Sequence, residues 1–239
     1  TLEGKTATMG DIFYPIYPIN GGFQAAIIKP YSDILVDLND NISFEAQSNS
    51  NANLQLFDNG VLIADTTNST IIEKNIFVNS PGDHQLVFRA DDGNTILYDT
   101  VNYVVIPPIT FLDPPGGLVD GINYINDSTV TLKFFAPEKN TVNLIGDHNN
   151  WLVNTNSFMK LSTDSLYWWQ TISNLNPGQK YTYQYLVDGN IKIADPLSPL
   201  ILDPNNDGII DSFNYPNPIP YPASKTNGFV TVMEPGKTP

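Results

Sequence analysis

The chain has 239 residues, of which 41% are hydrophobic and 15% charged, with 19 prolines and 16 glycines; this composition indicates a folded, turn-rich protein large enough for two domains. Its formal net charge is −14, from 25 acidic and 11 basic residues, which excludes the basic surface that nucleic acid or an anionic membrane would require. Cysteine is absent, so disulfides, thiol catalysis and zinc–thiolate sites are excluded as well.

The N-terminal half predicts one immunoglobulin-like β-sandwich over residues 23–106, preceded by residues 1–22 as a leading strand or the end of an upstream segment. Apolar and polar residues alternate in the short runs NISFEA, NLQLF and QLVFRA, which is the period of half-buried strands. Asp58-Asn59-Gly60 and Asp91-Asp92-Gly93-Asn94 each separate two apolar runs, which indicates hairpin turns.

A Pro- and Gly-rich stretch, VVIPPITFLDPPGG, follows at residues 104–117. Its Pro-Pro pairs cannot continue a sheet, so residues 107–117 are predicted to be a stiff linker. Residues 118–220 predict a second sandwich, with alternation in STVTLKFF and KYTYQYLV and a turn at Asp188-Gly189-Asn190. Residues 221–239 contain one strand-like run, GFVTVM, and are expected to lead out of this domain.

No amphipathic helix is evident, so the predicted fold class is all-β, with two immunoglobulin-like β-sandwich domains in tandem. No apolar run approaches the roughly 18 to 20 residues that a membrane helix needs. The first residues, TLEGKTATMGD, lack the basic start and apolar stretch of a signal peptide. We therefore expect any signal peptide to have been removed already.

No catalytic residues are predicted. The two histidines, His84 and His148, lie far apart in the chain, and neither has the strand–turn–helix setting of a hydrolase nucleophile. Most carboxylates occupy turns, where an aspartate side chain accepts hydrogen bonds from its own backbone.

Residues 202–214, LDPNNDGIIDSFN, have the spacing of a calcium loop. Positions 1, 3, 5 and 9 of such a loop are filled by Asp203, Asn205, Asp207 and Asp211. Position 12 is Asn214, where a glutamate would complete the shell, and no flanking helices are evident. The alternative is a polar turn closed by its own side-chain hydrogen bonds. Calcium is the one cofactor that the sequence indicates.

The three tryptophans are candidates for contact with sugars, whose C–H faces pack on aromatic rings. Trp168 and Trp169 are adjacent in a predicted strand, so their side chains point to opposite faces and one of them is expected in the core. Trp151 differs because it follows a turn rich in Asp and Asn, where no core is evident for a large ring.

Three motifs together resemble one family: GDHNNW (Gly146–Trp151), WWQTISNLNPG (Trp168–Gly178) and YQYLVDG (Tyr183–Gly189). In order and spacing they resemble the early-set sandwich of carbohydrate-binding module family 48, which is similar to the glycogen-binding domain of AMP-activated kinase and to the N-terminal domain of branching enzymes. PPGGLVDGINYINDSTVTL, YQYLVDGNIKIADP and YPASKTNGFVTV also resemble the region before the catalytic barrel in Bacteroidetes α-amylases of glycoside hydrolase family 13. IIKPYSDILVDLNDNISFEA resembles the immunoglobulin-like domain that precedes it there.

The resemblance implies an accessory region of an α-amylase-type enzyme that is secreted, periplasmic or on the cell surface. Residues 118–220 would then be an early-set domain that binds the α-glucans starch or glycogen, and residues 221–239 a linker towards a catalytic domain missing from this chain. The alternative is a structural spacer that packs against and positions the catalytic barrel without binding sugar. The chain is expected to be a monomer.

The resemblance also implies particular site residues. Trp151 matches the first sugar-stacking tryptophan, and Gln184 occupies the position of a hydrogen-bonding lysine. Asn190 and Ile191 stand where the family carries its second stacking tryptophan. The predicted carbohydrate contacts are Trp151, Asn150, Gln184, Trp168 and Trp169.

Overall fold

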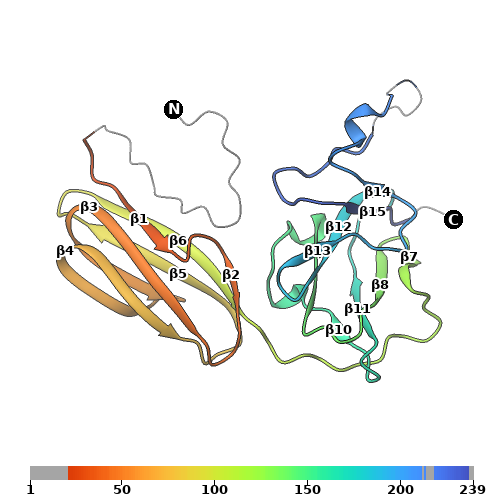
Figure 1. Cartoon of the computed structure of the whole chain (residues 1–239), viewed down its shortest axis with the longest axis horizontal. Helices are drawn as coiled ribbons and strands as arrows, with labels where there is room; N and C mark the ends of the chain where they lie inside the picture. The colour runs from red at the N-terminus through yellow and green to blue at the C-terminus, as the bar shows by residue number, and fades with distance from the viewer. Residues whose placement is uncertain (1–20, 212, 214–217, 237–239) are drawn as a thin grey trace. The chain divides into compact units, whose positions relative to one another are not determined.

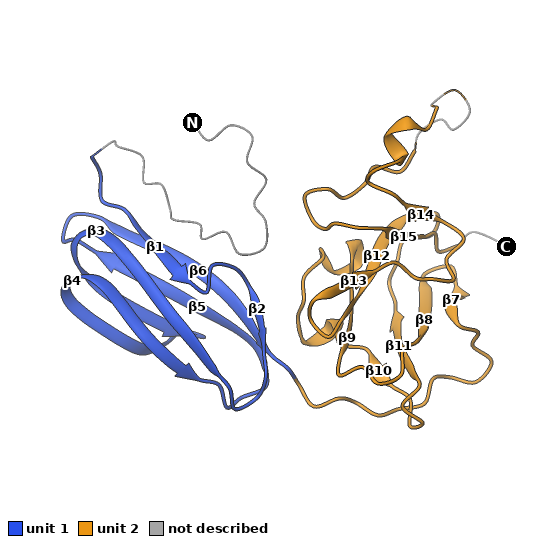
Figure 2. Ribbon diagram, in the orientation of Figure 1, with its two compact units in different colours: residues 1–106 blue, residues 107–239 orange. Residues whose placement is uncertain are grey.

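The structure is a computed structural model that describes residues 21–211, 213 and 218–236. The chain divides into two compact units between Ile106 and Pro107, and each unit consists of β-strands (Figure 2). The described helices are all short 3₁₀ helices, η1 (Asp147–Asn149), η2 (Thr155–Ser157) and η3 (Asp207–Ile209), and none of them could span a membrane. The predicted all-β fold class is confirmed.

The first unit is a six-stranded sheet wrapped around one core (Figure 1). Its strands are β1 (Ala25–Lys29), β2 (Ile34–Val36), β3 (Asn41–Asp58), β4 (Val61–Phe77), β5 (Gly82–Asp91) and β6 (Ile96–Val105). One edge of β3 pairs with β1 near its start and with β5 near its end, whereas β4 follows the other edge. Phe44, Leu54 and Leu56 of β3 are at most 1% exposed, so the apolar positions of the alternating pattern face the core.

The hairpin turns lie where the sequence predicts them. At the turn between β3 and β4, Asn59 and Gly60 have φ angles of 46° and 81°, and this pair of left-handed residues is what a type I′ turn requires. The strands around it differ from expectation in one respect, because NISFEA and NLQLF form the two ends of the single strand β3. Shifts in the pairing with β4 between Gln47 and Leu54 separate these two ends.

The second unit is a sandwich of two sheets around a core of its own. The first sheet has the order β10 (Lys160–Leu161), β11 (Tyr167–Ile172), β8 (Thr129–Phe135) and β7 (Gly121–Asn126). The second sheet contains β9 (Val142–Gly146), β12 (Tyr181–Val187), β13 (Ile191–Ile193), β14 (Ile201–Leu202) and β15 (Val230–Met233). One edge of β12 pairs with β9, while β15 and β13 share its other edge, and β14 pairs with β15. All residues of β12 are buried, so both faces of this strand are covered.

Two predicted boundaries differ from the structure. The predicted linker, residues 107–117, lies along the second unit, where Leu112 donates its amide to the carbonyl of Leu161 (2.8 Å). The second domain also does not end at residue 220, because Val230–Met233 is buried and pairs with β12. A linker assignment fails for this segment because its strand partner lies about 50 residues away in the chain, beyond the reach of a local pattern. Of the predicted N-terminal extension, residues 1–22, only Gly21 and Gly22 lie within the described residues.

Candidate functional site

The turn that carries Trp151 has a tightly fixed backbone. Gly146 has no room for a side chain, since a Cβ there would lie 2.4 Å from the carbonyl oxygen of Thr182. Asn149 accepts a hydrogen bond from the Gly146 amide (3.0 Å) and donates to the Leu144 carbonyl (2.9 Å). Trp151 has a φ of 63°, a left-handed conformation that is rare and costly for a bulky residue. The surrounding hydrogen bonds therefore hold the turn in a conformation that its sequence would not adopt alone.

Asp147 fixes the indole of Trp151. Trp151 Nε1 donates to Asp147 Oδ1 (3.0 Å), while Asp147 Oδ2 accepts from the amide and the hydroxyl of Thr182 on β12 (2.6 and 2.7 Å). One carboxylate thus joins the turn, the indole and the central strand. Charge-assisted bonds of this kind are stronger than neutral ones, so the ring is held in one orientation.

Trp151 is half-buried because its ring packs beside a small apolar cluster on the outer face of the second sheet. This outer-face cluster has a buried centre and a partly buried rim, formed by Leu202, Val230, Val232, Trp151, Leu200, Ile219 and Tyr221. One part of the Trp151 side chain therefore covers this cluster, and the other part is exposed to solvent. Asn150, next to it, is exposed, so these two predicted contacts are accessible.

The other three predicted sugar contacts are buried, which corrects their assignment as ligand-facing residues. Trp168 is 1% exposed and donates Nε1 to the carbonyl of Ala136 (3.0 Å). Trp169 is 5% exposed and donates Nε1 to the carbonyl of Leu112 (2.6 Å). Alternation in the strand does place the two rings on opposite faces, but the segment around Leu112 covers the second face, so neither ring is open to a sugar.

Gln184 is fully buried because a later segment of the chain lies over it. Its Nε2 donates to the carbonyls of Asn227 (2.8 Å) and Phe229 (2.6 Å), and its Oε1 accepts from the hydroxyl of Thr226 (2.5 Å). These bonds fix residues 226–229 against β12. The sequence carries no signal for them, since two of the three partners are backbone carbonyls that any residue could supply.

His148, the neighbour of Asp147, has buried ring nitrogens that meet no hydrogen-bond partner among the described residues. Burial lowers the pKa of His148 to about 4, and the nearby charge of Asp147 opposes this shift only in part. The ring is therefore neutral at pH 7 and fills space in the turn as an apolar ring would.

The predicted calcium loop is closed by its own hydrogen bonds. Asp203 Oδ1 accepts from the Asn205 amide (2.9 Å), and Asp207 Oδ2 accepts from the Asp203 amide (2.8 Å). Asp211 Oδ1 accepts from the amide of Phe213 (2.9 Å). Within residues 21–211, 213 and 218–236, no three His, Cys, Asp or Glu side chains come together as a metal site. Asn214 lies outside the described residues, and calcium binding here stays a prediction.

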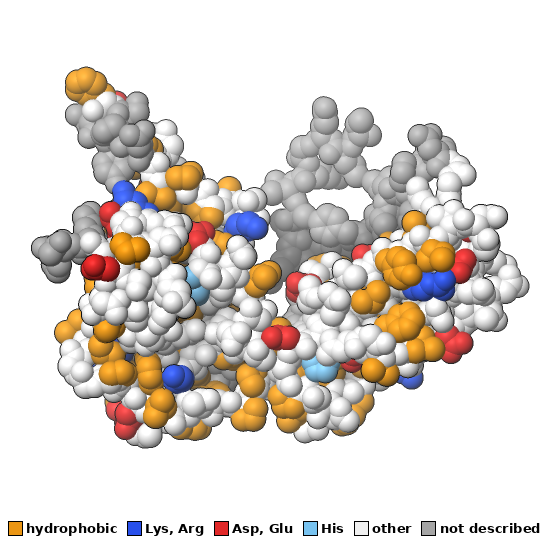
Figure 3. Space-filling model, turned by 180° about the vertical axis from the view of Figure 1, so that it is seen from behind, with side chains coloured by type: hydrophobic (Ala, Val, Ile, Leu, Met, Phe, Trp, Pro, Cys, Tyr) orange, Lys and Arg blue, Asp and Glu red, His pale blue; other side chains and the backbone are white. Residues whose placement is uncertain are grey.

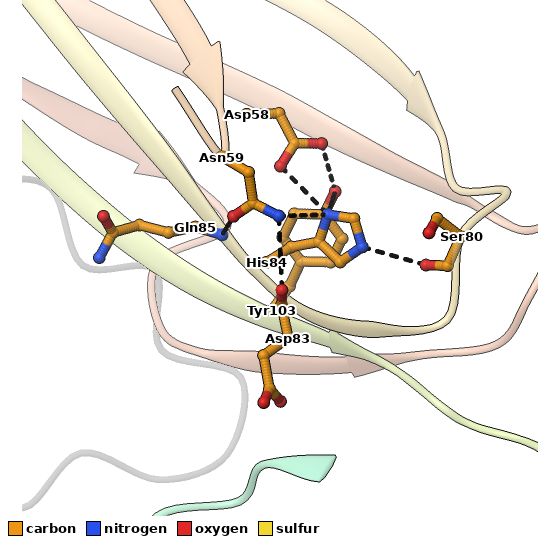
Figure 4. Close-up of polar contacts among 7 residues, drawn as sticks. All are labelled: Asp58, Asn59, Ser80, Asp83, His84, Gln85 and Tyr103. Atoms are coloured by element: carbon orange, nitrogen blue, oxygen red, sulfur yellow. Dashed lines mark hydrogen bonds and ion pairs between the residues drawn. The ribbon is translucent and has the colours of Figure 1, made fainter. Parts of the chain in front are cut away.

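A second polar cluster lies in the first unit, beside the turn between β3 and β4 (Figure 4). The Tyr103 hydroxyl donates to Asp58 Oδ2 (2.6 Å), and His84 Nδ1 lies 3.2 Å from Asp58 Oδ1. His84 Nε2 lies 3.0 Å from the Ser80 carbonyl oxygen, and the His84 ring stacks on Tyr103 at 4.6 Å between centroids. Burial, followed by the hydrogen bond to Asp58, raises the pKa of Tyr103. These contacts join β3, β5 and β6, which gives the cluster a structural role.

The distribution of basic side chains does not indicate a binding site for an anion. On the face drawn in Figure 3, the basic side chains of the described residues are few and scattered. An uncharged ligand is therefore a better match to this face than a polyanion, whose binding depends on clustered Lys and Arg.

Part of the second unit is similar to a known protein family. Residues 121–205 match the model of carbohydrate-binding module 48, described as the isoamylase N-terminal domain. A search of curated proteins finds no match. The match supports a carbohydrate-binding accessory domain, and it includes Asn150, Trp151 and Gln184 but ends before β15.

Solved structures are similar in fold alone. The pullulanase of Anoxybacillus sp. LM18-11 is 16% identical, with a TM-score of 0.27, and the match covers 74% of this chain and 26% of the pullulanase. β-Glucuronidase 3 of Bacteroides uniformis is 10% identical, with a TM-score of 0.30 and coverage of 73% and 25%. The fibronectin(III)-like modules of Clostridium thermocellum CbhA are 18% identical, with a TM-score of 0.31 and coverage of 35% and 96%. This chain thus spans about a quarter of the length of the two enzymes.

Proposed function

We propose that this chain is a non-catalytic accessory region of an exported α-amylase-type enzyme and that its second unit binds α-glucan through Trp151 and Asn150. The observation that carries the proposal is the match of residues 121–205 to carbohydrate-binding module 48, within which Trp151 stands on a surface turn with its indole bonded to Asp147. A starch or glycogen chain offers apolar C–H faces for the ring and hydroxyls for the exposed amide of Asn150.

The fixed orientation of the indole supports this function. A side chain that is already immobile loses little conformational entropy when a ligand binds, so more of the contact energy appears as affinity. The absence of charge on α-glucan also agrees with the scarcity of basic residues, 11 in 239.

Affinity electrophoresis in gels that contain glycogen tests the proposal. We expect glycogen to retard the wild-type chain, Trp151→Phe to keep part of the retardation because a ring remains without its bond to Asp147, and Trp151→Ala to abolish it. Leu152→Ala is the matched control, because Leu152 is the neighbouring residue and is 53% exposed. Unretarded wild type, or equal retardation of Trp151→Ala, contradicts the proposal.

Trp151 also covers the outer-face cluster, so a loss of fold must be distinguished from a loss of binding. The melting temperature and near-ultraviolet circular dichroism of Trp151→Ala provide this control. Asn150→Gly offers a second readout, because glycine accepts the left-handed φ of 56° at this position while removing the amide. We expect it to weaken glycogen binding without lowering stability.

The second candidate function is a spacer that packs against the catalytic domain of the same enzyme. It is favoured by the burial of Gln184, Trp168 and Trp169 and by apolar side chains that the second unit leaves exposed, since exposed apolar patches are typical of protein contacts. A separately produced catalytic domain that binds this chain, with no retardation of the chain in glycogen gels, would support the spacer over the sugar-binding domain.

A further inference from the structure

A surface hollow opens where two strands share one edge of β12 in the second unit. β15 pairs with Tyr181–Tyr183 and β13 with Tyr185–Val187, so the sheet divides between them. The hollow has a volume of about 340 Å³, within the range of roughly 300–1,000 Å³ that is typical of ligand pockets. Its lining includes Lys192, Ile193, Asp195, Ser198, Ile201 and Phe229.

Phe229 forms an apolar wall of this hollow, and its backbone is fixed by a hydrogen bond from Gln184. Its side chain is 51% exposed, while its carbonyl accepts a hydrogen bond (2.6 Å) from Gln184, which is 0% exposed. Ile201, on the same hollow, is 46% exposed. One exposed apolar residue needs no explanation, but here an aromatic ring on a fixed backbone and a branched aliphatic side chain line one concave surface.

The charges that line the hollow cancel. Lys192 is exposed, and its side chain forms no hydrogen bond or ion pair with any described residue. Asp195 is 3% exposed, and its carboxylate accepts from the hydroxyls of Tyr183 and Tyr185 (3.0 and 3.1 Å) and from the Leu197 amide (2.9 Å). The formal charge of the lining is thus zero, and the Lys192 ammonium is left as a free donor. These features suit an uncharged ligand with hydroxyl or ether oxygens and an apolar face.

We propose that this hollow is a second sugar site, in which Phe229 packs on the C–H face of a neutral sugar residue and Lys192 donates a hydrogen bond to its oxygens. The ligand class rests on the proposed function, but the site does not rest on Trp151. Phe229 also lies beyond residue 205, where the family match ends. The resemblance implies an aromatic ring at the position of Ile191 and a lysine at the position of Gln184. In the hollow, a ring and a lysine are present at other positions, as Phe229 and Lys192.

The test is a titration of the full chain with maltoheptaose, a linear α-1,4-glucan, followed by ¹H–¹⁵N NMR. We expect the amide signals of Lys192, Ile193 and Phe229 to shift. Phe229→Ala should weaken the binding that these signals report by about tenfold, equivalent to roughly 1.4 kcal/mol, and Phe229→Trp should preserve it. Lys192→Met, which keeps an unbranched stem without the donor, should weaken it less.

Phe77→Ala is the matched control, because Phe77 is 56% exposed but belongs to the first unit; it should leave the titration unchanged. The melting temperature of each variant shows that it is folded. In Trp151→Ala, the signals at the hollow should still shift, because the two sites share no residue.

The outcomes separate the two proposals. Shifts confined to the Trp151 indole, with no effect of Phe229→Ala, overturn the second site and leave the proposed function intact. Shifts at the hollow that persist in Trp151→Ala, without any at the indole, support the second site and contradict the role of Trp151. No shift in either place overturns both. Loss of binding to the catalytic domain in Phe229→Ala, without a response to sugar, would reassign the hollow to protein docking.

Discussion

His148 lies on the turn before Trp151, and its two ring nitrogens are buried without a hydrogen-bond partner among the described residues. A buried polar group without a hydrogen bond destabilises the folded state, typically by about 1–3 kcal/mol. This single ring therefore links the stability of the second unit to pH and also offers a substitution that should stabilise the protein.

The first prediction concerns pH. The pKa of His148 is about 4 in the folded chain and about 6.5 when the chain is unfolded. Between these values the unfolded state takes up a proton that the folded state does not, so unfolding becomes easier as pH falls. The free energy of unfolding should drop by about 1.4 kcal/mol per pH unit, or about 3 kcal/mol from pH 6.5 to pH 4. Urea unfolding across this window measures the slope.

His148→Phe should raise the free energy of unfolding at pH 7 by about 1–2 kcal/mol, because it removes buried nitrogens that lack partners. It should also remove the part of the pH slope that belongs to His148. Carboxylates with lowered pKa values, such as Asp113, titrate in both proteins, so the difference between the two slopes isolates the histidine. Identical slopes would show that His148 is not the titrating group.

At the scale of elements, the strands and turns were predictable because their signals are local. Alternation along β8 and β12 and the Asn59-Gly60 turn depend only on neighbours in the chain. The position of β15 depends on a strand partner about 50 residues earlier in the chain. The burial of Gln184 depends on backbone carbonyls, which every residue type has and which therefore leave no pattern in the sequence. Sequence thus located Trp151 on its turn, but it could not show how much of the ring the outer-face cluster covers.

Gln184 should hold residues 226–229 on the second sheet. Gln184→Ala removes three hydrogen bonds and leaves the Asn227 and Phe229 carbonyls and the Thr226 hydroxyl without this partner. We expect a loss of about 2–4 kcal/mol in the free energy of unfolding and faster amide exchange in residues 226–229.

Gln170→Ala is the matched control for Gln184→Ala, because the Gln170 side chain donates one hydrogen bond, to the Asn156 carbonyl (2.8 Å). Its expected cost is about 0.5–1.5 kcal/mol. If the two variants lose equal stability, the three bonds of Gln184 do not hold the segment as inferred.

At the scale of the whole molecule, the two units have separate cores, joined by a chain that crosses once between Ile106 and Pro107. A unit with its own core can fold alone. Folding of the second unit depends on where it ends, because β15 lies between β12 and β14 and completes their sheet.

The fragments 21–106 and 107–239 should each unfold cooperatively on their own, whereas fragment 107–220 should not fold. Loss of β15 removes Val230, Val232 and Met233, each at most 4% exposed. Burial of such a side chain contributes about 1.5–3 kcal/mol, so the loss approaches the 5–15 kcal/mol of net stability that is typical of a whole domain. Thermal melts followed by circular dichroism test this. A cooperative transition of fragment 107–220 near the melting temperature of 107–239 would mean that residues 221–239 are the linker their sequence suggests.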